Sequence, residues 1–304
     1  MRLIDTHSHL DFDEFDADRE QVIQRSHELG VERLVVLGVY QQNWQRVWQL
    51  AQTQPGVYAA LGLHPVFIDR HRPEHLVELY GRLEQLADDP KLCAIGEIGL
   101  DFYIETLDRD HQQQVFEAQL NMAREFELPV LIHARRSHAA VTASLKRNPV
   151  PRGGIVHAFS GSAEEAHNYI KLGFKLGLGG AATWPQAVRM HKVLPNLPLE
   201  SIVLETDSPD MAPAMFPGVR NSPEHLPAIC VALAELLGVN AQALAEASSA
   251  NARELFGWPV GGSLLPKQAM RSAGRSIREQ ARSYEDDWPP PINHRATHRK
   301  TRGR

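Results

Sequence analysis

Histidine and carboxylate side chains recur at one kind of position in this sequence, the later part of a short apolar segment. Imidazole nitrogens and carboxylate oxygens are ligands that proteins offer to divalent metal ions. A buried carboxylate without a partner is costly, and a metal ion supplies one. A lone strand histidine is more often a hydrogen-bonded core residue, but repetition at successive segments favours a metal site. The set is His7, His9, Glu97, His133, His157 and Asp207.

The number of these ligands predicts two metal ions rather than one. Four imidazoles and two carboxylates exceed what one tetrahedral ion accepts. Two ions about 3.5–4 Å apart accommodate them when one carboxylate bridges, and we expect Glu97 to be that bridge. The residue types do not choose among Zn²⁺, Mn²⁺, Mg²⁺ and Co²⁺. The expected ligands are, for one ion, His7, His9 and Asp207, and for the other, His133 and His157.

Three of the candidates have an expected catalytic role. Asp207 is placed to accept the proton of a metal-activated water as general base, although a carboxylate after a strand can also cap a helix. His64, which precedes Pro65, is expected either to contact a substrate phosphate or leaving oxygen, or only to fix its loop. Glu205 would bind a further ion or hold a ligand histidine in place.

Other polar residues near the same segments are expected to bind substrate or to support the ligands. Arg220 follows the last apolar segment and would bind an anionic substrate, or else is an ordinary surface arginine. Asp101 is expected to orient a ligand or to cap a helix rather than to bind metal. Asp5, just before the histidine pair, is expected to support the ligands from behind.

Eight short apolar segments carry these residues. Most lack strict alternation of polar and apolar residues, which is typical of parallel strands buried on both faces. Segments with helical spacing separate them, for example 108–127 and 162–173. The eight expected strands are RLIDTH (2–7), RLVVLG (33–38), VYAALGLH (57–64), LCAIGEIGLD (92–101), PVLIHA (129–134), GGIVHAF (153–159), FKLGLGG (174–180) and SIVLETD (201–207).

Repeated strand–helix units predict right-handed parallel crossovers, and eight of them favour a (β/α)8 TIM barrel over an open doubly wound sheet. No G-x-G-x-x-G follows the first strand, which also disfavours a dinucleotide-binding fold. In a barrel the ends of all eight strands meet at one rim, where barrel enzymes place their chemistry. Segments 222–238 and 240–257 predict two further helices, with Gly257 as C-cap, that complete the outer layer.

Composition sets limits on the class of protein. The chain has 304 residues, of which 43% are hydrophobic, enough for one large barrel domain at 1–260. It has no run of about 18 apolar residues, so we expect no membrane association. The start MRLIDTHSHL has no apolar signal core, and the two cysteines, Cys93 and Cys230, form no disulfide framework. We therefore expect a cytoplasmic protein, and a monomer because no added dimerisation element is visible.

Charge is unevenly distributed along the chain. The net charge is −5, but residues 260–304 carry ten basic and four acidic residues, so this end is +6 and the rest is −11. An acidic body does not indicate nonspecific nucleic-acid binding, whereas a basic tail could add some. We expect 261–304 to be a basic, disordered C-terminal extension.

Eight motifs appear in a fixed order: DTHSHL (5–10), GLHP (62–65), GEIGLDF (96–102), LPVLIHAR (128–135), HAFSG (157–161), LETDSP (204–209), RNSP (220–223) and NARELF (251–256). In this the chain resembles the TatD family of metal-dependent hydrolases and DNases, within the amidohydrolase-like barrels. The resemblance implies a (β/α)8 barrel, two metal ions and phosphodiester hydrolysis, often as a 3′→5′ exonuclease. Glu97 stands where other amidohydrolases often have a carboxylated lysine. The compact family members lack the extension past residue 260.

Three functions remain open from the sequence. The first is a divalent-metal-dependent phosphodiesterase, a 3′→5′ exodeoxyribonuclease that acts on single-stranded DNA through a two-metal-activated water. The second is an amide or ester hydrolase, such as a deacylase of D-aminoacyl-tRNA, in which the same metals polarise a carbonyl group. The third is a nucleic-acid-binding protein with a vestigial barrel that works through its basic tail. The intact set of ligands argues against the third.

Overall fold

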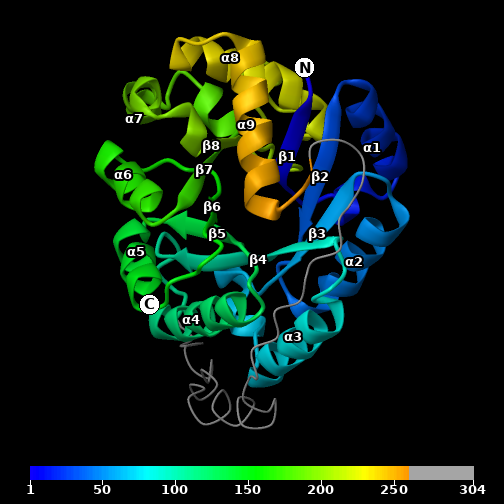
Figure 1. Ribbon diagram of the computed structural model, residues 1–304, viewed down its shortest axis with the longest axis vertical. Helices are drawn as coiled ribbons and strands as arrows, with labels where there is room; N and C mark the ends of the chain where they lie inside the picture. Colours follow the sequence, from blue (N-terminus) through cyan, green and yellow to red (C-terminus); the bar gives the residue numbers. More distant parts are fainter. Residues whose placement is uncertain (260–304) are drawn as a thin grey trace, which may run out of the picture.

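Eight parallel strands follow one another around the barrel in sequence order, each paired with the next. The computed structural model describes residues 1–259, and the predicted extension 261–304 lies outside the described residues (Figure 1). Every strand overlaps its expected segment, so the predicted (β/α)8 fold is confirmed. The strands are β1 (Leu3–Ser8), β2 (Val31–Leu37), β3 (Val57–Leu61), β4 (Leu92–Asp101), β5 (Val130–Arg135), β6 (Gly154–Val156), β7 (Phe174–Leu178) and β8 (Ile202–Leu204).

The first and last strands meet and nearly close the barrel at their carboxyl ends. Ser8 forms an isolated parallel bridge with Ser208. The backbone N–H of His9 donates to the carbonyl of Ser208 (2.7 Å), and that of Asp207 donates to the carbonyl of His7 (2.9 Å). These bonds join segments about 200 residues apart. They hold His7, His9 and Asp207 side by side at the rim.

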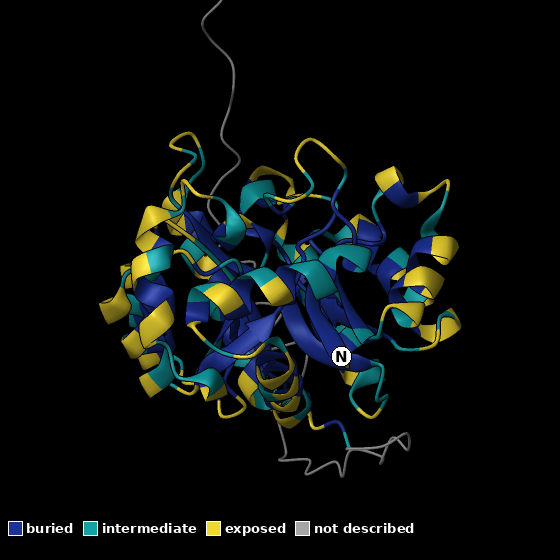
Figure 2. Cartoon of the chain, turned by 90° about the horizontal axis from the view of Figure 1, so that it is seen from above, coloured by how far each residue is buried: buried dark blue, intermediate teal, exposed yellow. Residues whose placement is uncertain are grey.

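Helices cover the outside of the strands, so both faces of the sheet are buried. Figure 2 shows buried strands at the centre and exposed residues on the outer faces of the helices and in the loops. The expected helices at 108–127 and 162–173 are present, capped by the side chains of Asp108 and Ser162. The outer helices are α1 (Arg19–Glu28), α2 (Trp44–Thr53), α3 (Pro73–Leu86), α4 (Arg109–Glu125), α5 (His138–Arg147), α6 (Ala163–Lys171), α7 (Val188–Val193) and α8 (Leu226–Leu237).

The last helix, α9 (Ala241–Phe256), differs from the expectation that it joins the outer layer. Its end packs Leu255 and Phe256, with Trp258 after it, against buried side chains that begin the strands, such as Ile4 and Val203. Figure 1 shows α9 (orange) inside the ring of outer helices. It therefore covers the end of the barrel opposite the predicted site. The helix is held there because it buries apolar side chains at the open end of the barrel. The residue pattern of the strands does not show which helix covers that end.

Helix α9 ends at Gly257 as predicted. Gly257 has a φ of 68°, and its N–H donates to the carbonyl of Glu254. This left-handed conformation favours glycine as a helix C-cap. Within residues 1–259, no single helix is long and apolar enough to cross a membrane, although the bent pair Pro223–Leu237 and Ala241–Phe256 passes that test of length and composition together.

Gly99 in β4 lets two strands approach closely, and this yields a prediction. Its φ is 143°, and a Cβ placed there would lie 2.0 Å from the carbonyl oxygen of His133 on β5. We expect Gly99→Ala to lower the free energy of unfolding by about 3 kcal/mol or more, measured by urea denaturation. Gly81→Ala in α3 is the control, because nothing lies within 4 Å of its added Cβ. Equal stability of the two variants would contradict the prediction.

Candidate metal centre

Glu97 lies at the middle of the predicted site, and its two carboxylate oxygens face different groups of histidines. Its side chain is 2% exposed and comes from the later part of β4. Oε2 lies 3.2 Å from Nε2 of His7 and 3.4 Å from Nε2 of His9. Oε1 faces the histidines that come from β3, β5 and β6. All six residues predicted as metal ligands meet here.

The first group combines His7, His9 and Asp207. Oδ1 of Asp207 lies 3.4 Å from Nε2 of His7 and 3.5 Å from Nε2 of His9, so each Nε2 faces two carboxylate oxygens. An imidazole N–H points along one line and donates well to only one acceptor. The arrangement therefore fits a cation placed between the rings and the two carboxylates better than it fits hydrogen bonds alone.

The second group surrounds Oε1 of Glu97. Nε2 of His157 lies 2.8 Å from it, Nε2 of His64 3.0 Å and Nδ1 of His133 3.3 Å. The two histidine nitrogens, Nδ1 of His133 and Nε2 of His157, are themselves 3.2 Å apart. His64 begins the loop after β3 and accepts a hydrogen bond from the backbone of Val66. Its Nε2 therefore faces Glu97 directly.

The spacing of these donor atoms fits metal ions. Two ligands that share an ion at roughly 2.1 Å in a tetrahedral or octahedral arrangement lie about 3.0–3.4 Å apart, close to the distances above. Within residues 1–259, neither Glu97 nor Asp207 forms an ion pair with a lysine or arginine. Two buried carboxylates need positive charge nearby, which a divalent ion bound among these rings would supply. The residues present therefore match the ligand set that a divalent metal takes.

The surrounding rings set the charge of both carboxylates. Burial alone would raise their pKa values, but nearby His64, His157 and His7 hold the pKa of Glu97 well below its ordinary value. A hydrogen bond from His9 and the charges of His157 and His7 likewise hold the pKa of Asp207 below its ordinary value. Both groups are therefore carboxylates at neutral pH, the form that binds metal.

Strained backbone lies next to the ligands. Asp207 has a φ of 56°, Ala158 after His157 has 43°, and Arg136 has 54°. Residues other than glycine rarely adopt this left-handed region, and they keep it where the surrounding structure enforces it. The strain thus concentrates at the rim, where the ends of β5, β6 and β8 aim side chains inward.

Asp101 contacts His133 and orients its ring, which is one of the two roles expected for Asp101. Its Oδ2 accepts a hydrogen bond from Nε2 of His133 (2.9 Å), which places the proton on Nε2 and leaves Nδ1 free to face Glu97. Its Oδ1 accepts from the backbone N–H groups of Tyr103 and Ile104. A carboxylate behind a ligand histidine fixes the ring and raises its basicity.

The contact between Asp101 and His133 should strengthen metal binding. We expect Asp101→Asn to weaken metal affinity about 10- to 100-fold, because an amide oxygen holds the His133 proton less strongly than a carboxylate does. Calorimetric titration of the metal-free protein with Mn²⁺ and Zn²⁺ measures this. Asp108→Asn, which changes a carboxylate that caps α4, is the control. Unchanged affinity in Asp101→Asn would show that the contact does not support the site.

Asp5 and Glu205 lie behind the ligands. Asp5 accepts hydrogen bonds from the backbone of His7 and from the backbone and hydroxyl of Thr206, which ties β1 to the end of β8. Glu205 accepts a hydrogen bond from the N–H of Ala158, and its Oε1 lies 3.9 Å from Nδ1 of His157. Burial raises the pKa of Asp5 to about 7 and that of Glu205 to about 8. The roles predicted for Glu205 stay predictions.

Arg220 is held by the protein itself. Its guanidinium donates to both carboxylate oxygens of Asp18 (2.9 and 2.7 Å) and lies 4.3 Å from the centre of the Phe15 ring. A substrate anion would have to compete with this pair. Its predicted role in substrate binding stays a prediction, and the structure shows instead that it joins the loop after β8 to the loop after β1.

Sequence analysis did not single out three exposed residues: Tyr103 in the loop after β4, Arg135 at the end of β5, and Arg136 directly after it. Arg135 comes two residues after the ligand His133, and Tyr103 two residues after Asp101. Their place at or directly after strand ends is the signal that could have found them.

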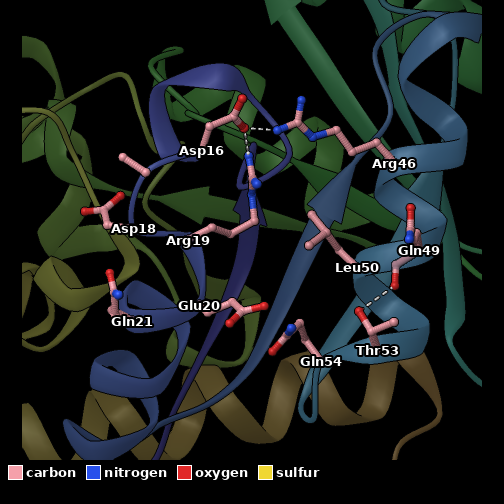
Figure 3. Close-up of a pocket in the computed structure, with 11 residues that line it drawn as sticks. Asp16, Asp18, Arg19, Glu20, Gln21, Arg46, Gln49, Leu50, Thr53 and Gln54 are labelled. Carbon is pink, nitrogen blue, oxygen red and sulfur yellow. Dashed lines mark hydrogen bonds and ion pairs between the residues drawn. The ribbon is translucent and has the colours of Figure 1, made fainter.

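Two cavities lie near these loops and helices. One, of about 390 Å³, lies between α1 and α2 (Figure 3), where Arg19 and Arg46 both bind Asp16. None of its lining residues is a predicted ligand. The other, of about 210 Å³, includes Ala158, the residue after His157, and is lined by small and apolar residues together with Ser160, Gln186 and Arg189. Of these two cavities, only the second has a lining residue next to a predicted ligand, Ala158 after His157.

Residues 4–257 match the family model described as TatD related DNase. The chain belongs to the TatD family. It is thus a metal-dependent hydrolase with a (β/α)8 barrel, and the resemblance found in its motifs is confirmed over nearly the whole of the described chain.

Relatives and solved structures agree with this. A protein of Escherichia coli (strain K12) named "Uncharacterized metal-dependent hydrolase YjjV" is 40% identical over 85% of this chain and 99% of its own length. Its crystal structure aligns with a TM-score of 0.81. A protein of Pantoea vagans named "3'-5' ssDNA/RNA exonuclease TatD" is 33% identical over 80% of this chain and 95% of its own length. A TatD family hydrolase from Entamoeba histolytica, 19% identical with a TM-score of 0.76, shares the fold.

Proposed function

We propose that this protein is a two-metal phosphodiesterase that removes nucleotides from the 3′ end of single-stranded DNA. The observation that carries the proposal is the division of the histidines between the two oxygens of Glu97. A carboxylate that faces two groups of ligands is the arrangement that a bridged pair of ions requires. The exonuclease names of relatives at 33–34% identity support the nucleic-acid substrate.

Each side chain has a distinct role in this proposal. His7, His9 and Asp207 would hold one ion, and His133 and His157 the other, with Glu97 shared. Ions such as Mg²⁺, Mn²⁺ or Zn²⁺ supply a lower pKa for bound water and positive charge for the phosphate oxygens. Asp207, an anion at neutral pH, accepts the proton of the attacking water.

The remaining polar residues position substrate and ligands. His64 is 7% exposed, and its Nε2 faces Oε1 of Glu97; it would have to turn this Nε2–H from Glu97 to donate to a phosphate or leaving oxygen. Asp101 keeps the His133 ring in place. The cavity beside His157 would accept the terminal base. The monomeric state and cytoplasmic location stay predictions.

The test is nucleotide release from a single-stranded oligonucleotide. A 3′-labelled strand should release labelled mononucleotide at once, and a 5′-labelled strand should give a ladder that shortens from the 3′ end. Activity should require Mg²⁺, Mn²⁺ or Zn²⁺ and stop with EDTA. Aminoacyl-tRNA is assayed in parallel. Nuclease activity that persists in EDTA would overturn the metal mechanism, and release only from the aminoacyl ester would move the substrate to a carbonyl compound.

A further inference from the structure

Three exposed side chains form a layered cluster at the rim. The guanidinium carbon of Arg135 lies 3.8 Å from the centre of the Tyr103 ring, and that of Arg136 lies 4.8 Å from it. Tyr103 is nevertheless 46% exposed, one of the few large hydrophobic side chains left open to solvent among the described residues. Beside it, Arg109 lies 4.8 Å from the ring of Phe102. We call Tyr103, Arg135 and Arg136 the rim cluster.

The rim cluster is tied directly to the metal centre. One oxygen of Asp101 accepts from Nε2 of His133, and the other accepts from the backbone of Tyr103 (2.9 Å). On the other side, Arg135 ends β5, in register with Asp101 on β4. One carboxylate therefore fixes both a ligand ring and the loop that carries Tyr103. A strand bound at the metal centre would therefore lie close to the rim cluster.

The arginines of the rim cluster are available to a substrate. Across residues 1–259, neither Arg135 nor Arg136 forms an ion pair, whereas Arg220 is paired with Asp18. An acidic body does not attract DNA by net charge, so binding must come from local positive groups. Guanidinium groups donate to phosphate oxygens in a fixed fork geometry, and their planes also stack on aromatic rings.

The combination of these groups points to one ligand class. Single-stranded nucleic acid is bound by aromatic rings on which bases stack and by basic groups that follow the backbone. Arg136 has a left-handed backbone conformation, φ 54°, and its guanidinium carbon lies 4.8 Å from the centre of the Tyr103 ring. A lone small phosphoester at the metals would not need such a surface.

We propose that the rim cluster binds the nucleotides next to the scissile bond, with a base stacked on the Tyr103 and Arg135 layer and phosphates held by Arg135 and Arg136. This inference rests on the proposed nuclease function and adds the substrate-binding surface to it. It also explains how an acidic protein would retain a strand between successive cleavages.

The experiment compares an oligonucleotide with a substrate too small to reach the rim cluster. KM and kcat are measured for single-stranded oligo(dT) and for bis(p-nitrophenyl) phosphate. The quantity compared is the KM for oligo(dT) divided by the KM for the small ester. In Tyr103→Ala this KM ratio should rise about tenfold, because stacking of one base on an aromatic ring contributes roughly a tenfold gain in affinity. Tyr103→Phe should restore the wild-type ratio. Arg135→Ala should also raise the ratio and make oligonucleotide binding less steeply dependent on salt, by about one ion.

Arg124→Ala is the charge-matched control, because Arg124 is an exposed arginine in the last turn of α4, away from the rim. Its KM ratio should stay at the wild-type value. If the KM ratio is unchanged in both Tyr103→Ala and Arg135→Ala while the enzyme still cleaves oligonucleotides, the proposed role of the rim cluster is wrong and the nuclease proposal stands. Wild-type enzyme that hydrolyses the small ester but neither binds nor cleaves oligonucleotides would overturn the nuclease proposal and the cluster with it.

Discussion

Asp207→Asn should lower kcat about 10³- to 10⁴-fold on every phosphodiester substrate. The substitution keeps the size of the side chain but removes both the negative charge and the proton acceptor. Asp207 Oδ1 faces Nε2 of both His7 and His9, so its loss also weakens the first group of ligands. Single-turnover rates with saturating Mn²⁺ separate the chemical step from metal loss.

The control is Asp110→Asn, which changes a carboxylate in the first turn of the outer helix α4. Its kcat should match the wild type. Thermal melting of each variant shows whether the barrel is intact, and metal analysis shows whether ions are still bound. If Asp207→Asn retains more than a tenth of wild-type kcat with its metal bound, another group accepts the proton.

Glu97→Gln should remove most bound metal, and this is the second large effect. Each oxygen of Glu97 faces its own group of histidines, so one substitution affects both proposed ions. We expect the metal content after dialysis to fall from two ions per chain to less than one. The hydrolytic activity should fall together with the metal content. Elemental analysis and calorimetric titration measure the content and the affinity.

Stability gives an independent readout for the same variant. Without metal, the surrounding histidines favour the charged form of Glu97, so metal-free Glu97→Gln should unfold more easily than the metal-free wild type. Added Mn²⁺ should stabilise the wild type but not the variant. Glu84→Gln, an exposed position on α3, serves as control. Two ions bound to Glu97→Gln at wild-type affinity would show that the two groups do not share this carboxylate.

Much of the fold follows from local pattern in the sequence. Strands buried on both faces read as continuous apolar runs, so all eight were visible without tertiary information. Ser162, Asp108 and Gly257 mark helix ends because their side chain or backbone satisfies terminal groups there. Parallel strands in a barrel end at one rim, and for this reason residues as distant as His7 and Asp207 could be assigned to one site.

Tertiary structure alone decided which groups touch. His64 faces Glu97, and Asp101 binds His133, because strand register and loop conformation set the direction of each side chain. Arg220 is paired with Asp18 across 202 positions of sequence, a contact that no local spacing encodes. Helix α9 packs against the strand starts rather than the outer layer. Residue type and position along a strand determine what chemistry is available, whereas packing between distant segments determines where each donor points.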